Sequence, residues 1–262
     1  MKQLIKLSYI SFVALAMSSS LAFAADTVND ANQTAFSDQQ TKQVESIVHN
    51  YIVKHPQVIV ESMQNLQEQQ VNKEKSLLTN NAQKFNKEIF NPNTAGRFSI
   101  GNPNGKVIMT EFFSYQCPNC RMMEQMVASL VKNNPELQVI FIAWPFENKD
   151  DVYAAKAVFA AQKQGKAFEL HAALMNAPDL LTQESIDKIV KTIPGLNVSQ
   201  MQKDMSDAAI DDSLKANFKL AQTLQLNFTP VFIFTNQDKS KFTVVPGRVE
   251  QFELKKAIKE VK

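Results

Sequence analysis

The fold of this chain is indicated most directly by the segment Glu111-Phe112-Phe113-Ser114-Tyr115-Gln116-Cys117-Pro118-Asn119-Cys120-Arg121. The apolar run Val107–Phe113, which leads into it, predicts a buried strand. A helix is expected after Cys120, where apolar residues recur at helical spacing: Met122, Met123, Met126, Val127, Leu130 and Val131. The next apolar run, Leu137–Ala143, is rich in Val and Ile and predicts a second strand. Strand, helix and strand in this order predict a parallel pair in an α/β fold.

Cys117 and Cys120 lie where this helix is expected to begin. The first backbone N–H groups of a helix are unpaired and its dipole is positive there, so the pKa of the Cys117 thiol should fall. The thiolate is the nucleophile in disulfide exchange. Cys120 follows one helical turn later and can close the ring or release a mixed disulfide. Pro118 suits the first helical position because it lacks an N–H group that would be unpaired anyway.

Three interpretations of this cysteine pair compete. It closes too short a loop to add much entropic stability as an inert structural bridge. A zinc site usually needs four ligands, and the histidines His49, His55 and His171 show no ligand spacing. A Cu(I) site with two thiolates needs fewer ligands and stays open as an alternative. Redox catalysis is the favoured interpretation, with no metal and no cofactor expected at the pair.

The N-terminus has the pattern of an export signal. Lys2 and Lys6 precede the uncharged apolar stretch Leu7–Met17, and Ala22-Phe23-Ala24 has the form that a signal peptidase cleaves. A membrane anchor is the alternative, but the apolar stretch is shorter than the roughly 20 residues needed to span a bilayer. Cleavage after Ala24 would leave 238 of the 262 residues and a formal charge near zero. Such a charge does not favour nucleic-acid binding.

Residues 25–90 are expected to form a helical arm. Ser37 with Gln40 three residues later is a capping-box pattern, and an apolar helical spacing follows it. His55-Pro56 should break the helix, because the residue before a proline avoids helical angles. Residues 67–87 are very polar and predict a solvated helix or a linker helix. So small an arm cannot form a large core, and oligomerisation is a usual remedy, so we expect self-association rather than folding back on the rest of the chain.

Residues 91–262 are expected to form one domain. Asn91–Lys106 contains several prolines and glycines and predicts a boundary, whereas residues 152–226 predict helices interrupted at Gly165, Pro178 and Pro194-Gly195. Lys149, Asp150 and Asp151 are interpreted as a solvated loop, and Trp144-Pro145-Phe146 as packing or groove lining at a strand end. The remaining segments predict two strands and a final helix: Pro230–Thr235, Phe242–Val245 and Gln251–Val261.

These segments resemble the DsbA family of thioredoxin-fold periplasmic oxidoreductases. The resemblance rests on Glu-Phe-Phe-x-Tyr-x-Cys-Pro-x-Cys at 111–120, on Thr229-Pro230-Val231-Phe232, which resembles the family's cis-proline loop, and on Pro246-Gly247. It covers residues 91–262 and implies a thioredoxin fold with a helical insertion at about 152–226. The arm, with Tyr51-Ile52-Val53-Lys54-His55-Pro56, is similar to the oligomerisation region of DsbA-like dimers and trimers.

The resemblance also implies roles for individual residues. Cys117 matches the attacking cysteine and Cys120 the resolving one, while Thr229 and Pro230 match the loop that pairs with substrate backbone. Pro118 and Asn119 are expected to contact substrate as well. Asn119 replaces the histidine of well-known members, which predicts a weaker oxidant, since an imidazole would favour the thiolate more.

Glu111 matches a buried acid beneath the family's active site, which could accept the proton of Cys120. An exposed position at a strand edge is equally compatible with the sequence. The implied function is formation or isomerisation of disulfides in cysteine-containing exported proteins, with recycling by a membrane redox partner. The alternative is a copper-binding or chaperone-like envelope protein.

Overall fold

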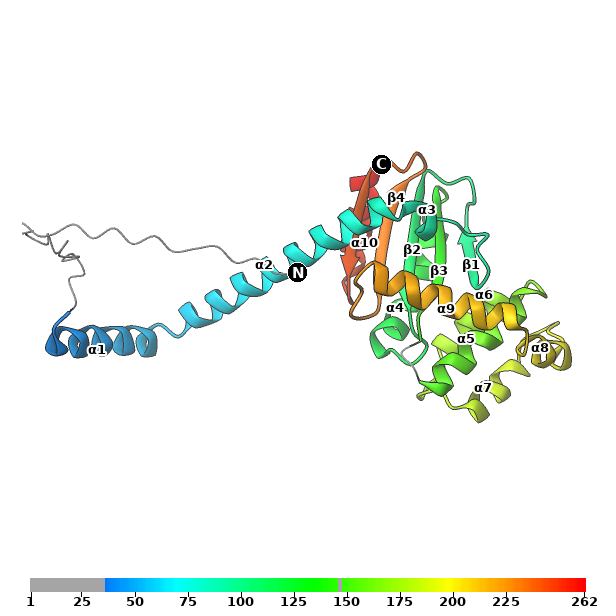
Figure 1. The fold of residues 1–262 in the computed structure, drawn as a ribbon, viewed down its shortest axis with the longest axis horizontal. Helices are drawn as coiled ribbons and strands as arrows, with labels where there is room; N and C mark the ends of the chain where they lie inside the picture. Colours follow the sequence, from blue (N-terminus) through cyan, green and yellow to red (C-terminus); the bar gives the residue numbers. More distant parts are fainter. Residues whose placement is uncertain (1–35, 146–147) are drawn as a thin grey trace, which may run out of the picture. The chain divides into compact units, whose positions relative to one another are not determined.

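A computed structural model describes residues 36–145 and 148–262 (Figure 1). The predicted signal peptide, residues 1–24, lies outside the described residues. The chain divides into two units after Val60, and each is described by itself. The predicted limit between arm and domain, at residue 90, falls inside the second unit. Within the described ranges, every helix is too short or too polar to traverse a lipid bilayer.

The first unit contains α1 (Asp38–Lys54) and the start of α2 (Gln57–Lys84). The predicted capping box is confirmed: the Ser37 hydroxyl accepts from the backbone of Gln40, whose side chain accepts from the backbone of Ser37. The predicted break at His55-Pro56 is also confirmed, since it separates the two helices. Within the described chain no residue of α1 is buried. Most of its apolar side chains are exposed there: Val44, Ile47, Val48, Tyr51 and Val53.

The second unit is built on a five-stranded sheet with the order β1-β3-β2-β4-β5. The strands are β1 (Arg97–Gly101), β2 (Val107–Phe113), β3 (Leu137–Ala143), β4 (Val231–Asn236) and β5 (Phe242–Pro246). As predicted, β2 and β3 are parallel, and the other neighbours are antiparallel. The sequence interpretation missed β1, because its segment was interpreted as a boundary loop. This strand pairs with β3 along its whole length.

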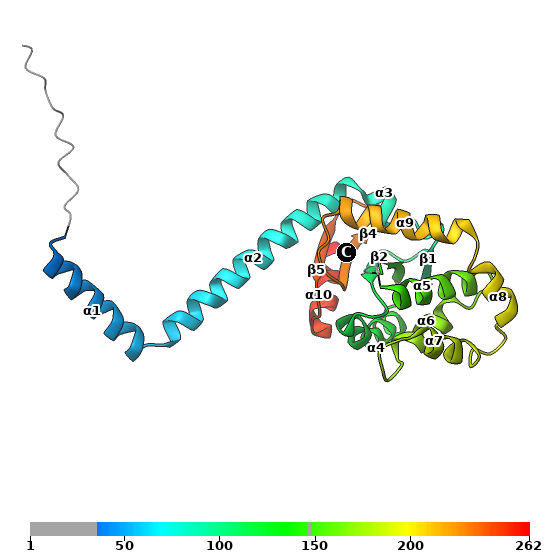
Figure 2. The same cartoon turned by 60° about the horizontal axis from the view of Figure 1, so that its bottom comes forward.

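Helices cover both faces of the sheet, with α3 and α9 on one side and α4 and α5 on the other (Figure 2). The helices that follow α2 are α3 (Asn86–Ile89), α4 (Pro118–Lys132), α5 (Lys149–Gln162), α6 (Ala167–Met175), α7 (Gln183–Val190), α8 (Val198–Asp204), α9 (Ala208–Thr223) and α10 (Gln251–Val261). The predicted breaks at Gly165, Pro178 and Pro194-Gly195 all lie between helices. The solvated loop predicted at 149–151 is wrong, because these residues form the first turn of α5.

Two apolar cores result, because both faces of β2 are buried. Met109 and Phe113 belong to the core beneath α4 and the inserted helices, and Phe112 belongs to the core on the opposite face. Leu78 and Ala82, from the last turns of α2, pack into that second core. The prediction of a solvated helix over 67–87 is therefore wrong at its end, which forms part of the domain.

Candidate active site

The site begins where β2 ends and α4 starts. Cys117 has extended backbone angles and is the N-cap of α4, and Pro118 occupies its first turn. The Cys117 sulfur accepts a hydrogen bond from the backbone N–H of Cys120 at 3.3 Å. Both cysteines are free thiols; Cys117 is half-buried and Cys120 is buried. The predicted position at a helix start is confirmed, and a partner molecule can reach only the first of the two sulfurs.

The environment separates the pKa values of the two thiols. Hydrogen bonding from Cys120, and to a smaller extent from Thr229 and the α4 backbone, lowers the pKa of Cys117 to about 6 although burial opposes this shift. Burial raises the pKa of Cys120 far above its usual range, and its hydrogen bond and charge interaction with Cys117 act in the same direction. Near neutral pH, Cys117 therefore carries the negative charge of the reduced pair.

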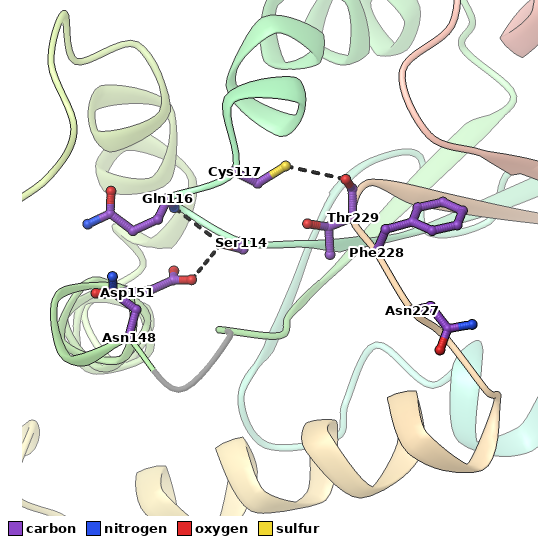
Figure 3. A pocket seen from close by; sticks show the side chains of 8 residues that line it. All are labelled: Ser114, Gln116, Cys117, Asn148, Asp151, Asn227, Phe228 and Thr229. Carbon is purple, nitrogen blue, oxygen red and sulfur yellow. Dashed lines mark hydrogen bonds between the residues drawn. The ribbon is translucent and has the colours of Figure 1, made fainter.

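Thr229 lies opposite Cys117 (Figure 3), and the Thr229–Pro230 peptide bond is cis. The Cys117 thiol donates to the Thr229 carbonyl oxygen, with 3.3 Å between sulfur and oxygen. A carbonyl favours the thiol, since it can only accept. The Thr229 hydroxyl is buried and has no hydrogen-bond partner within the described ranges. A hydroxyl can donate, whereas a carbonyl cannot, and the Thr229 side chain contributes to the lowered pKa of Cys117.

A cavity of about 380 Å³ opens beside Cys117. The loop before β4 supplies Asn227, Phe228 and Thr229 to its lining, and the α4 and α5 side supplies Ser114, Gln116, Cys117, Asn148 and Asp151 (Figure 3). Of the residues predicted to contact substrate, Thr229 lines this cavity, and Pro230 follows it in the chain. Pro118 instead lines a neighbouring cavity. Asn119 lines neither cavity.

Glu111 lies in the middle of the sheet, paired with Phe141 on β3 and Phe232 on β4. Its side chain is 1 % exposed, so the alternative of a solvated strand edge is wrong. Burial, followed by the charges of Glu124 and Cys117, raises the pKa of Glu111 well above its ordinary value. Its Oε2 atom has no hydrogen-bond partner among the described residues. A buried carboxyl with these properties can hold a proton where an ordinary glutamate cannot.

Asp151 is a site residue that the sequence interpretation missed. It is buried in the first turn of α5, where its Oδ1 atom accepts from the Tyr115 backbone N–H at 2.8 Å and its Oδ2 atom accepts from the Ser114 hydroxyl. Gln116 follows Tyr115 in the chain. Its side chain donates to the Leu181 carbonyl and accepts from the Leu181 backbone N–H. The loop that precedes Cys117 is thus fastened to the helical insertion at consecutive residues.

A second missed group is the buried chain Tyr115–His171–Glu124. The Tyr115 hydroxyl lies 3.1 Å from His171 Nδ1, and His171 Nε2 lies 3.0 Å from Glu124 Oε2. The three side chains are at most 2 % exposed, and they join the active-site loop to α6 and α4. The available signal was the presence of charged side chains on the apolar faces of two helices, where they require partners.

The fold and this site define a thioredoxin-like protein, and comparisons with known proteins agree. Residues 93–259 match the family described as Thioredoxin, and residues 40–71 match the one described as Copper resistance protein ScsC N-terminal domain. A thioredoxin-like oxidoreductase from Silicibacter pomeroyi is 32 % identical, covers 68 % of this chain and 95 % of its own, and has a TM-score of 0.58.

Two further relatives point the same way. A probable disulfide bond formation protein D of Bacillus anthracis is 27 % identical over 60 % of this chain and 78 % of its own. A linker-deletion variant of Proteus mirabilis ScsC shares the fold, at 23 % identity and a TM-score of 0.59, over 87 % of this chain and 97 % of its own. The chain therefore belongs to the thioredoxin family and is a thiol–disulfide oxidoreductase.

Proposed function

We propose that this protein forms or isomerises disulfides in cysteine-containing exported proteins through Cys117 and Cys120, and that it acts in the periplasm after cleavage near Ala24. The observation that carries the proposal is the pairing of an accessible thiol of pKa about 6 with a buried thiol one turn later. A low pKa makes Cys117 both a ready nucleophile and a good leaving group.

The reaction proceeds in two exchange steps. In the oxidised enzyme, a substrate thiolate attacks the Cys117 sulfur, the Cys117–Cys120 bond breaks, and Cys120 leaves with the electron pair. A second thiolate of the substrate then attacks the substrate sulfur that is bonded to Cys117. The new bond is the substrate disulfide, and Cys117 leaves as a thiolate. Two electrons pass from substrate to enzyme, and a membrane redox partner takes them up to restore the pair. In the reduced enzyme, Cys117 attacks wrong disulfides and acts as an isomerase.

Glu111 exchanges a proton with Cys120 during the reaction. Because burial makes a Cys120 thiolate costly, this sulfur must be protonated as it leaves and deprotonated as it attacks. Glu111 lies beneath the pair, interacts electrostatically with both cysteines, and holds a proton at higher pH than an exposed glutamate does. It supplies the proton in one direction and accepts it in the other.

Substrate backbone pairs with the loop at Thr229 and Pro230, while Pro118 and Asn119 contact the substrate beside the attacking sulfur. The cavity lined by Cys117 and Thr229 supports the contact at Thr229, because an extended peptide joined to Cys117 would have room there. Pro118 borders the neighbouring cavity.

Insulin reduction and the refolding of scrambled ribonuclease test the proposal. Wild type should be active in both, and Cys117→Ala should be inactive. Cys120→Ala is the matched variant: it keeps the nucleophile and should accumulate mixed disulfides with substrate. Equal activity of wild type and Cys117→Ala in both assays would refute an enzymatic role of the pair.

We further propose that the arm makes a homodimer or trimer. The apolar side chains of α1 are exposed, among them Ile47 at 67 %, and a second copy would bury them. Because Leu78 and Ala82 belong to the core of the second unit, the informative deletion is residues 25–60 rather than the whole arm. Sedimentation should show an oligomer for the mature chain and a monomer after the deletion. A monomer in both samples would contradict self-association.

A copper-binding function is the second candidate, because residues 40–71 match the N-terminal domain of a copper resistance protein. Two thiolates at Cys117 and Cys120 suit Cu(I). Titration of the reduced protein with Cu(I) distinguishes the two functions. Stoichiometric binding together with negligible disulfide exchange would favour copper handling over catalysis.

A further inference from the structure

A cavity of about 480 Å³ lies between α3, the loop that leads into β1, and α9. These helices cover the face of the sheet opposite α4 (Figure 2). One face of α9 supplies Ala216, Lys219, Leu220 and Thr223 to the lining, at the spacing of residues that share a helix face. The residues that line this cavity are different from those that line the cavity beside Cys117, so the two sites are separate.

Arg97, the first residue of β1, forms the floor of this cavity and is 3 % exposed. Successive strand residues point to opposite faces, and Phe98 belongs to the core beneath α4, so Arg97 points to the side of α3 and α9. The Nη1 atom of Arg97 donates to the carbonyls of Glu88, Ile89 and Asn91. Since α3 ends at Ile89, these bonds satisfy carbonyls at a helix end.

The other edge of the Arg97 guanidinium has no such partners. Neither Nε nor Nη2 makes a hydrogen bond within the described ranges, and Arg97 forms no ion pair there. The Nε atom is fully enclosed, whereas Nη2 is not, so Nη2 is the atom that a ligand can reach. Burial lowers the pKa of Arg97 to about 10, and the charge of Glu88 opposes this shift only in part. A buried cation in this position would be stabilised by an anion in the cavity.

The rest of the lining is positively charged at the rim and partly apolar. Lys87 and Lys219 are exposed, and neither makes an ion pair with another described residue. With Arg97 they outnumber the acidic Glu88 by three to one among the described lining residues. Phe85 adds a half-buried aromatic ring, and α9 adds apolar surface beside it. The cavity thus combines a positive charge with room for an apolar group.

We infer that this cavity binds a small organic carboxylate, whose acid group meets Arg97 and whose apolar body lies against Phe85 and Ala216. One buried positive charge is matched by one negative charge, and Glu88 disfavours a second one, as in phosphate. The volume lies within the range of about 300–1,000 Å³ that is typical of small-molecule sites. The inference adds a second site to the protein and does not depend on the exchange reaction.

Calorimetric titration of the mature chain with octanoate tests the inference. Wild type should bind one octanoate per chain. Acetate, which has the acid group alone, and 1-octanol, which has the apolar body alone, should each bind at least tenfold more weakly. Inorganic phosphate should also bind at least tenfold more weakly than octanoate. Equal affinities for octanoate and 1-octanol would overturn the role of Arg97, and phosphate binding as tight as that of octanoate would overturn the stated ligand class.

Variants on α9 locate the bound octanoate. Ala216→Phe should fill the cavity and abolish binding. Lys219→Gln should weaken binding about two- to fivefold, as expected for an exposed charge. Lys215→Gln, on the same helix but outside the cavity, is the matched control and should bind like wild type. Unchanged affinity in both Ala216→Phe and Lys219→Gln would show that octanoate binds elsewhere, and the inference would be wrong.

Arg97→Met keeps the apolar stem of the side chain and should abolish binding. This variant also removes the hydrogen bonds at the end of α3, so the exposed positions Ala216 and Lys219 decide the question if it does not fold. Cys117→Ala should bind octanoate like wild type. Octanoate binding by a protein without exchange activity would overturn only the proposed function, and exchange activity without octanoate binding would overturn only this inference.

Discussion

The sulfur of Cys117 lies 3.3 Å from the carbonyl oxygen of Thr229, across the junction between the start of α4 and the loop before β4. The Thr229 hydroxyl is buried beside it without a partner among the described residues. The Thr229 carbonyl accepts from the Cys117 thiol, whereas the Thr229 side chain contributes to the lowered pKa of Cys117, so one residue acts on both protonation states.

Cys120 should control the ionisation of Cys117, because its hydrogen bond is the largest cause of the lowered pKa. Thiolate absorbance of the reduced protein should rise with a midpoint near pH 6. Cys120→Ala should raise the midpoint, and Cys120→Ser, which keeps a donor, should leave it closer to the wild-type value. Identical midpoints in Cys120→Ala and wild type would show that the helix start alone lowers the pKa.

The same shift predicts how the stability of the reduced protein depends on pH. The pKa of Cys117 is lower in the folded state than the ordinary value of 9.0 expected in the unfolded state. The folded state is therefore favoured above the unfolded pKa, and this contribution is lost as the pH falls through about 6. Relative to Cys117→Ser, the free energy of unfolding of the reduced wild type should increase between pH 6 and 9. Urea denaturation under reducing conditions measures the difference, and a flat difference would contradict it.

Asn119 should limit the oxidising strength of the pair. A histidine there adds a donor or a positive charge, so Asn119→His should lower the pKa of Cys117 and make the reduction potential less negative. Asn119→Gln, which keeps a neutral amide, is the matched control and should stay near wild type. We expect the wild-type potential to lie between about −180 and −120 mV, the values for protein disulfide isomerase and DsbA. Equilibration with glutathione buffers measures all three.

Glu111 should destabilise the protein increasingly as the pH rises. Its folded pKa is raised, so its contribution to stability is complete below the unfolded value of 4.5 and is lost as the pH rises through the folded value. The advantage of Glu111→Gln over wild type should grow by up to about 1.4 kcal/mol per pH unit between 4.5 and the folded value, and should level off above the folded value. Denaturation at several pH values tests this, with Glu68→Gln on the exposed surface of α2 as the control. Glu111→Gln should also slow the resolution of mixed disulfides.

Removing one member of the His171–Glu124 pair should lower the free energy of unfolding much more than replacing both members by apolar residues. His171→Leu leaves a buried carboxylate and the Tyr115 hydroxyl without their partner, and should lower the free energy of unfolding by about 3–5 kcal/mol. His171→Leu/Glu124→Leu removes both polar groups of the pair and should recover most of that loss. Urea denaturation compares the variants. A double variant as unstable as the single one would show that packing, rather than the unpaired charge, is responsible.

Much of the second unit could be predicted because its signals are local. The limits of β2, β3 and α10 follow from apolar runs and helical spacing within each segment. β1 could not be recognised in the same way. It is five residues long, only Arg97 and Phe98 are buried, and it depends on pairing with β3 rather than on its own pattern.

The site divides along the same line. Cys117, Cys120 and Thr229 stand in short motifs that could be identified in the sequence. Asp151 and His171 could not be placed there, since Asp151 lies 36 residues from Tyr115 and His171 lies 56 residues from it. Their meeting with the loop depends on how the inserted helices pack on α4, which no local pattern encodes.

Thr229 follows Cys117 in the chain by 112 residues, and the whole helical insertion lies between them. While the polypeptide is being synthesised, the first sulfur therefore emerges well before the loop that completes its surroundings. During that interval the nascent protein carries two reduced, exposed cysteines. A new copy can therefore be a substrate for disulfide formation before it becomes a catalyst, and folded copies already present are suited to oxidise it.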